Sequence, residues 1–170
     1  NGIEVNTGYL WSMADDYDVS RFIFINKMDQ EEAEFSEVYE ELNNNFEESL
    51  LPITTPFGQE DGLKGITDIL NQEIVQEGKK KDIGEEVDIE DYRFDLVETI
   101  VELDDELMMK YLEDEEIKNK ELINALINGV SEGEIIPVFV GSAEKNIGVK
   151  TLLDYLTKLS PSPLDNDVIT

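Results

Sequence analysis

The 170-residue sequence has no cysteine and no histidine, and it has only 13 Lys and Arg residues against 41 Asp and Glu residues. The first two absences exclude a disulfide framework, a zinc site and a Ser-His-Asp triad. No apolar run approaches the ~18 residues of a membrane-spanning helix, and the first residues show no signal-peptide pattern. These absences favour a soluble intracellular domain, and the lack of cysteine fits the cytoplasm.

The scarcity of basic residues also limits the choice of partner. The formal net charge is −28 at pH 7, so direct binding to a nucleic-acid phosphate backbone is disfavoured by repulsion. We infer contact with a basic protein rather than bare RNA, and no sequence-specific recognition of nucleic acid. The alternative is that the acidity serves solubility. The 170 residues are enough for one sizeable core, or for one core plus a small satellite, and the hydrophobic content of 40% is well above that of a disordered chain.

The strongest motif is Asn26-Lys27-Met28-Asp29, which follows directly on an apolar run at 22–25 that predicts a buried strand. Guanine presents two donors side by side, N1–H and the exocyclic amine, and an ionised Asp29 can accept both. Asn26 would hold the loop and face the N7/O6 edge, and Lys27 would lay its methylene stem along the base. Adenine lacks this donor pattern, so the motif predicts a site that selects guanine.

A second loop completes the predicted site. The apolar run at 135–140 ends in Gly141-Ser142-Ala143, where small residues allow backbone N–H groups to approach the base oxygen. A Gly-Ser-Ala tripeptide alone is also compatible with a simple strand-to-helix turn. Both loops follow a predicted strand and precede a helical pattern, and we therefore expect Ser142 and Ala143 to act together with the first motif.

At these motifs the chain resembles elongation factor G. The resemblance runs in order along nearly the whole chain, through segments 24–29, 56–61, 65–69, 107–112, 141–149 and 159–165. It implies an α/β fold, namely a partial P-loop GTPase (Ras-like) three-layer fold lacking its N-terminal half, with an α+β inserted subdomain. It also implies GTP/GDP as cofactor, with Mg²⁺ in the parent protein, and the ribosome as partner.

The spacing of the two loops supports this resemblance. Asn26 and Ser142 are 116 positions apart, whereas one crossover helix in a minimal Ras-like domain would separate such loops by a few tens of residues. We therefore expect residues 1–47 and 134–160 to form the C-terminal half of a GTP-binding domain, residues 48–133 to form the inserted subdomain, and residues 161–170 to lead toward the next domain. The strands at 21–25 and 135–140 should pair in parallel, with helices around them.

The residues that would bind phosphate are missing. The sequence has no G-x-x-x-x-G-K-[ST] loop, which cradles phosphates and places Mg²⁺, and the family's D-x-P-G-H segment is absent as well. The first residue is Asn1, and the simplest interpretation is a fragment of a longer protein. We expect no catalytic residue and no metal ligand in this chain, and no hydrolysis by the chain alone.

The predicted insertion begins with a β-hairpin or small sheet over 50–75, followed by a loop at 78–84 around three lysines. Residues 92–113 predict one acidic amphipathic helix, with Glu98, Glu102 and Asp105 along one face. Between positions 85 and 116 there are fifteen acidic and two basic residues. In elongation factor G the inserted subdomain meets the ribosomal stalk protein through an acidic helix, so the resemblance implies that contact here. A plain solvated face is the alternative.

The parent protein is therefore predicted to be a translational GTPase that uses GTP to promote ribosomal translocation. Two alternatives stay open. The chain could be a stand-alone acidic interaction module with vestigial nucleotide loops, or the parent could be a ribosome-protection or release-factor paralogue.

Overall fold

A computed structural model of the chain describes residues 3, 5–17, 19–58, 62–84 and 87–160. The helices are α1 (Val5–Asp16), α2 (Phe35–Asn45), α3 (Glu90–Val101), α4 (Asp105–Leu112), α5 (Asn119–Ser131) and α6 (Val149–Leu159). The strands are β1 (Ile23–Ile25), β2 (Ser49–Pro52), β3 (Thr54–Phe57), β4 (Gly65–Asp68), β5 (Glu73–Gln76), β6 (Lys79–Asp82) and β7 (Ile135–Val140). The expected linker at 161–170 lies outside the described residues.

The first sheet is parallel and has the strand order β1-β7-β2. The expected parallel pairing of β1 with β7 is confirmed, with Ile25 opposite Val140. The assignment of residues 50–52 to a hairpin of the insertion was wrong, because β2 joins the parallel sheet and places Pro52 opposite Val138. The error has a physical cause: Leu50, Leu51 and Pro52 are all buried, so their pattern has no period that would distinguish the two sheets.

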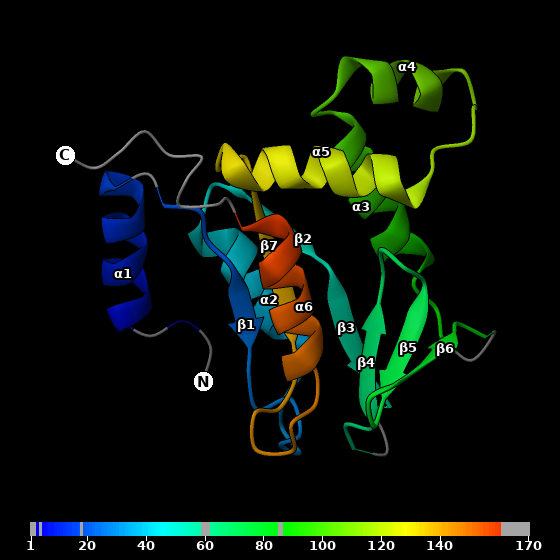
Figure 1. Cartoon of the computed structure of the whole chain (residues 1–170). Coiled ribbons are helices and arrows are strands. Elements are labelled where there is room, and N and C mark those ends of the chain that lie inside the picture. The colour runs from blue at the N-terminus through cyan, green and yellow to red at the C-terminus, as the bar shows by residue number, and fades with distance from the viewer. Residues whose placement is uncertain (1–2, 4, 18, 59–61, 85–86, 161–170) are drawn as a thin grey trace.

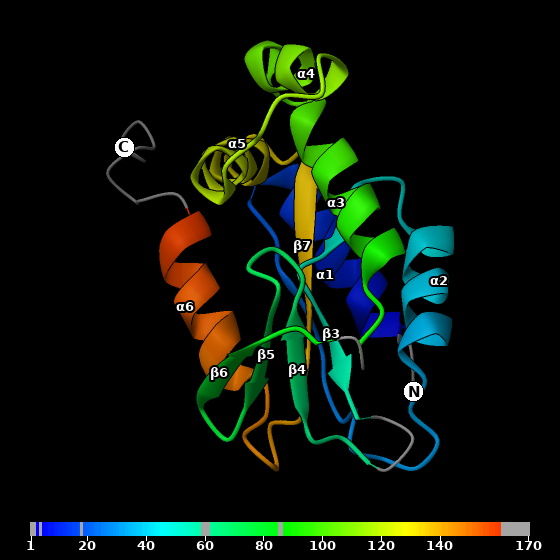
Figure 2. The same cartoon turned by 90° about the vertical axis from the view of Figure 1, so that its right-hand side faces the viewer.

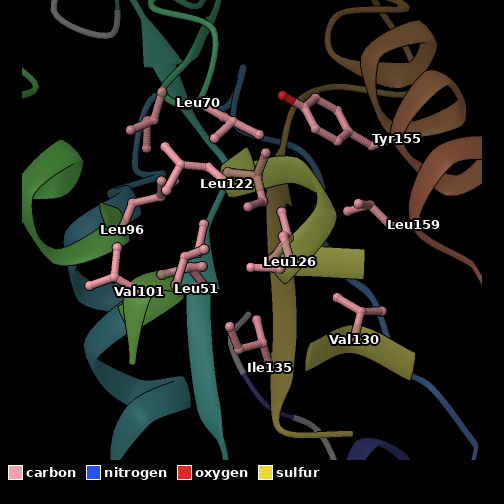
Figure 3. Packing of buried hydrophobic residues seen from close by; sticks show 14 of the residues in the cluster. Leu51, Leu70, Leu96, Val101, Leu122, Leu126, Val130, Ile135, Tyr155 and Leu159 are labelled. Carbon is pink, nitrogen blue, oxygen red and sulfur yellow. The ribbon is translucent and has the colours of Figure 1, made fainter. Parts of the chain in front are cut away.

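β7 is buried along its whole length and divides two hydrophobic cores. Ile135 and Phe139 join the core that lies against α5 and α6, which also contains Tyr155 and Leu159 (Figure 3). The alternate residues of β7, among them Val138, join the core on the α2 side. In Figure 2 the sheet lies between α6 on one side and α2 on the other, which confirms the predicted three-layer α/β arrangement.

The second sheet is antiparallel with the order β3-β4-β5-β6 (Figure 1). Only Ile53 separates the end of β2 from the start of β3, so the chain passes directly from the first sheet into the second. The prediction of a loop around the three lysines was wrong, since Lys79–Asp82 forms the edge strand β6. Its residues are all exposed, and lysines are suited to an unpaired sheet edge because they oppose aggregation.

The acidic segment forms two helices rather than the predicted single one. α3 ends at Val101, and α4 begins at Asp105 after the Asp104 side chain accepts the N–H groups of Glu106 and Leu107 at 2.9 and 3.1 Å. An aspartate is favoured at such an N-terminal cap position, so Asp104 starts a new helix where the periodicity alone suggested continuation. None of the helices in the described part of the chain is long and apolar enough to cross a membrane.

Candidate functional site

The two predicted loops meet at the carboxyl ends of neighbouring parallel strands. Ile25 and Val140, the last residues of β1 and β7, are register partners, so the loops leave the sheet side by side. Two backbone hydrogen bonds then join them. The Gly141 N–H donates to the Ile25 carbonyl at 3.0 Å, and the Met28 N–H donates to the Gly141 carbonyl at 3.1 Å. The carboxyl end of a parallel sheet is where α/β folds bind their ligands.

Asn26 cross-links the loops through its side chain. Its Oδ1 atom accepts the N–H of Lys27 at 2.8 Å and the N–H of Ala143 at 2.9 Å. Because both partners are donors, the oxygen must face them, and the amide nitrogen therefore faces the other way. The structure thus brings together two of the predicted site residues that are 117 positions apart in the sequence.

Lys27 occupies the left-handed region, with φ at 64°. A non-glycine residue in this region costs of order 1 kcal/mol or more, and such residues gather at functional loops. The conformation is held by hydrogen bonds on both sides, since the Lys27 carbonyl accepts the Gln30 N–H at 3.1 Å. The Lys27 side chain is exposed, and it is therefore accessible to a flat ligand at the strand ends.

The Asp29 carboxylate sits between Ser142 and Lys145. Its side chain is only 7% exposed, and the Lys145 Nζ lies 3.7 Å from Oδ2. A hydrogen bond from the Ser142 hydroxyl is the main cause that holds the pKa of Asp29 below its usual 3.8; Lys145 also lowers this pKa and partial burial opposes it. Asp29 is therefore an anion at neutral pH, as an acceptor of two guanine donors must be.

Ser142 is fully buried, and its hydroxyl also accepts the backbone N–H of Lys145 at 3.1 Å. This bond, together with the pairing of Ser142 with Ile147, folds the loop back so that Lys145 reaches Asp29. Sequence reasoning missed Lys145. The only signal was its place three residues after Ser142, and this becomes informative only once the turn is known.

Two glycines make this compact loop sterically possible. A Cβ atom on Gly141 would lie 2.1 Å from the carbonyl oxygen of Ile147. A Cβ atom on Gly148 would lie 2.3 Å from the carbonyl oxygen of Val140, and Gly148 also has a φ of 78°. Any side chain at either position would force the backbone of the loop apart.

The predicted partner-binding residues lie away from this site. Glu102 caps the end of α3 and Asp105 is the first residue of α4, whereas Glu98 lies within α3. All three are exposed. In Figure 1 this part of the chain stands at the opposite end of the molecule from the loops that follow β1 and β7. The structure therefore separates a loop site from an acidic surface.

The three layers, the parallel strands and the two joined loops at their carboxyl ends define a Ras-like α/β nucleotide-binding domain. Residues 1–162 match the model of the elongation factor Tu GTP-binding domain. The chain is 38% identical over 164 residues to an elongation factor G-like protein of Thermotoga maritima. This alignment covers 95% of the present chain and 24% of the Thermotoga protein. A crystal structure of a Thermus thermophilus protein superposes with a TM-score of 0.85 at 27% identity, covering 96% of this chain and 26% of the other.

The chain belongs to the family of elongation factor Tu GTP-binding domains, and within it to the elongation factor G group of translational GTPases. It spans about a quarter of the length of these two relatives. The resemblance to elongation factor G that the sequence suggested is confirmed at this level.

Proposed function

We propose that this chain supplies the guanine-recognition part of a GTP-binding domain in a translation factor that binds GTP and promotes ribosomal translocation. The observation that carries the proposal is the joined pair of loops, in which Asn26 is bonded to Ala143 while Asp29 lies beside Ser142. This constellation matches the donor and acceptor pattern of one base.

In this proposal Asp29 accepts hydrogen bonds from the N1–H and the exocyclic amine of guanine. Because its lowered pKa keeps the carboxylate ionised, both bonds are charge-assisted and strong. The amide nitrogen of Asn26 is left to donate to the N7/O6 edge. The Ala143 N–H, which donates to Asn26 in this structure, would be shared with the guanine oxygen O6. Lys27 would cover one face of the ring with its aliphatic stem.

The residues of this chain fit the base and not the phosphates. No G-x-x-x-x-G-K-[ST] loop is present in the sequence, so neither the phosphate cradle nor its Mg²⁺ ligand can come from this chain. Bound Mg²⁺ would neutralise phosphate charge in the parent protein. We expect the chain alone to bind GDP weakly or not at all and to hydrolyse no GTP.

The test is titration calorimetry of GDP and xanthosine diphosphate into wild-type chain and Asp29→Asn. Xanthine carries a carbonyl where guanine carries its amine, so an amide at position 29 should reverse the preference between the two nucleotides. Asp95→Asn, at an exposed site on α3, is the matched control and should leave binding unchanged. If wild type is folded and binds GDP, but Asp29→Asn does not alter the choice of base, the assignment of Asp29 is wrong.

We also propose that the acidic surface formed by Glu98, Glu102 and Asp105 contacts a basic surface of the ribosome, namely the stalk protein. Within the described residues none of the three makes an ion pair, so their charge is available to steer a basic partner. The split between α3 and α4 distributes these charges over two helix ends. A cytoplasmic location follows from this role.

Charge reversal of Glu98 and Glu102 to lysine should weaken binding to purified stalk protein, and should do so most at low salt. Reversal of Glu115 and Glu116, which lie outside the helices, is the control. If the variant at Glu98 and Glu102 binds the stalk protein with unchanged affinity, the acidic surface is only a solvated face. Stalk binding without any nucleotide binding would favour the stand-alone interaction module, while the paralogue alternative requires the sequence beyond this chain.

A further inference from the structure

A regular parallel ladder between β2 and β7 is interrupted just before the guanine-binding loop. The Ile53 N–H donates to the Val138 carbonyl at 2.9 Å, and in a regular ladder the Val140 N–H would next donate to the Ile53 carbonyl. That carbonyl instead accepts the Ile69 N–H at 3.0 Å, because the chain has already turned into the second sheet. The Val140 N–H is taken by the Thr54 hydroxyl at 3.0 Å.

The second sheet also contacts α6, the helix that follows this loop, through Asp68. This carboxylate is 1% exposed, and its Oδ1 accepts the Tyr155 hydroxyl of α6 at 2.9 Å. Asn71 completes the arrangement, because its side-chain amide donates to Asp68 Oδ2 at 2.8 Å and to the Tyr155 hydroxyl at 2.9 Å. In Figure 3 the Tyr155 ring lies within the core, with its oxygen turned toward Leu70.

Thr54 and Asp68 are register partners in the β3–β4 pair. One holds the last residue of β7 before the loop, and the other holds the helix α6 that begins after it. Ile66, two residues before Asp68 on β4, fills the space beside Gly148, with a methyl group 3.3 Å from where a Cβ atom would be. The β3–β4 pair therefore contacts both ends of the segment that carries Ser142 and Ala143.

We propose that Thr54 and Asp68 are positioning residues for the guanine-binding loop, so that the antiparallel sheet sets the geometry of Ser142 and Ala143. The inference rests on the proposed function only for its nucleotide readout. A buried N–H without an acceptor is strongly unfavourable, so the Val140 amide can stay in place only while the Thr54 oxygen is present. The Thr54 contact is a side chain-to-backbone bond across 86 positions, and it therefore ties the geometry of one sheet to the other.

The test compares Thr54→Val with Thr67→Val. Both replace a buried threonine by an isosteric valine in paired strands, but the Thr67 hydroxyl has no hydrogen-bond partner among the described residues. Amide hydrogen exchange by NMR in the 170-residue chain should accelerate at least about tenfold at Val140, Ser142 and Ala143 in Thr54→Val, and stay within about twofold in Thr67→Val.

Thr54→Ser restores the acceptor oxygen and should return these exchange rates to within about threefold of wild type, which a loss of methyl packing alone would not do. Tyr155→Phe removes the hydrogen bond from α6 to Asp68 and so tests the contact that follows the loop. It should accelerate amide exchange at Ser142 and Ala143 while leaving exchange at Val140 slow. If Thr54→Val does not fold, Thr54→Ser and Tyr155→Phe still decide the question.

Equal exchange rates in Thr54→Val and Thr67→Val would overturn the proposal. Fast amide exchange at Ser142 and Ala143 in Thr54→Ser, with exchange in the rest of the sheet unchanged, would overturn it as well. Where wild type binds GDP, its dissociation constant should rise about three- to tenfold in Thr54→Val. If wild type binds no nucleotide, the proposed function fails while the exchange data still test the positioning role.

Discussion

The two sheets of this chain have different interiors. β7 in the parallel sheet is buried throughout and carries only apolar side chains. The neighbouring β3–β4 pair buries polar ones, namely Thr54, Thr55, Thr67 and Asp68. The remaining buried polar side chains among the described residues are Ser142 and Thr151, which lie in the loop and the helix that β3 and β4 touch. Buried polarity is thus concentrated at the junction between the sheets.

This difference separates two physical tasks. Apolar burial in the parallel sheet supplies free energy but little directional information, since one aliphatic contact resembles another. Hydrogen bonds at the junction are directional and favour one arrangement, because groups such as the Val140 N–H and the Asp68 carboxylate are satisfied by specific side chains. The proposed guanine-binding loop lies on the polar side of this division.

The largest effect is expected at Gly148, in the loop that belongs to the polar junction. Gly148→Ala adds a Cβ atom 2.3 Å from the Val140 carbonyl oxygen at a φ of 78°. Strain and overpacking together should destabilise the chain by about 2 to 6 kcal/mol. Gly133→Ala is the control, because Gly133 has a φ of 76° and open space around it. Urea unfolding should show a clearly smaller loss in the control; equal losses would mean that backbone strain alone matters.

The next effect compares a buried strand with an exposed one in the same sheet. Ile66→Ala on β4 removes a fully buried side chain and should cost about 2 to 5 kcal/mol. Lys80→Ala on β6 removes a half-exposed lysine paired with Glu73 at 2.6 Å and should cost less than about 1 kcal/mol. Thermal and urea unfolding measure both. A costly Lys80→Ala would show that the lysine edge contributes more than its exposure suggests.

These positions also show what the sequence can and cannot predict. β1 and β7 were predictable because apolar runs end directly in polar motifs, so the pattern of residues alone places the Asn26 and Asp29 loop and the Ser142 loop at strand ends. Their mutual contact followed from parallel pairing. The position of β2 was not predictable, because residues buried on both faces carry no periodic signal.

The junction could not be read from the sequence either. Thr54 acts through a hydrogen bond to a residue 86 positions away, and Asp68 through one to a residue 87 positions away. A threonine and an aspartate within a predicted β segment suggest solvent exposure, and only the tertiary contacts reverse that expectation. Lys145 was missed for the same reason. The break at Asp104, by contrast, had a local signal in the cap residue that the apolar periodicity obscured.

A smaller effect is expected at Asp104, in the insertion but away from the junction. Asp104→Ala removes the acceptor for two N–H groups at the start of α4 and should cost about 1 kcal/mol. Asp105→Ala, one residue further along and without a capping bond, should cost less than about 0.5 kcal/mol. Amide exchange at Glu106 and Leu107 should accelerate only in the first variant. Equal exchange rates in the two variants would show that the Asp104 side chain does not cap α4, and would favour the original interpretation of one continuous helix.

The smallest effect concerns a half-buried polar contact on the parallel-sheet side, where Glu48 joins α1 to the start of β2. Its Oε1 accepts the Trp11 indole N–H and an Arg21 guanidinium N–H, each at 2.8 Å. Partial burial raises the pKa of Glu48, but its own backbone N–H, Trp11 and Arg21 together outweigh this and hold the pKa below the usual 4.5.

Since the folded-state pKa of Glu48 is lowered, its contribution to stability is fully present above pH 4.5 and is lost as the pH falls through the folded-state pKa. Glu48→Gln keeps an oxygen for Trp11 but removes the charge, and it should cost about 0.5 to 1 kcal/mol at pH 7 and less at pH 3. Trp11 is the sole tryptophan, so its fluorescence reports on this contact directly. A difference between wild type and Glu48→Gln that does not shrink below pH 4 would show that packing, rather than charge, holds α1 here.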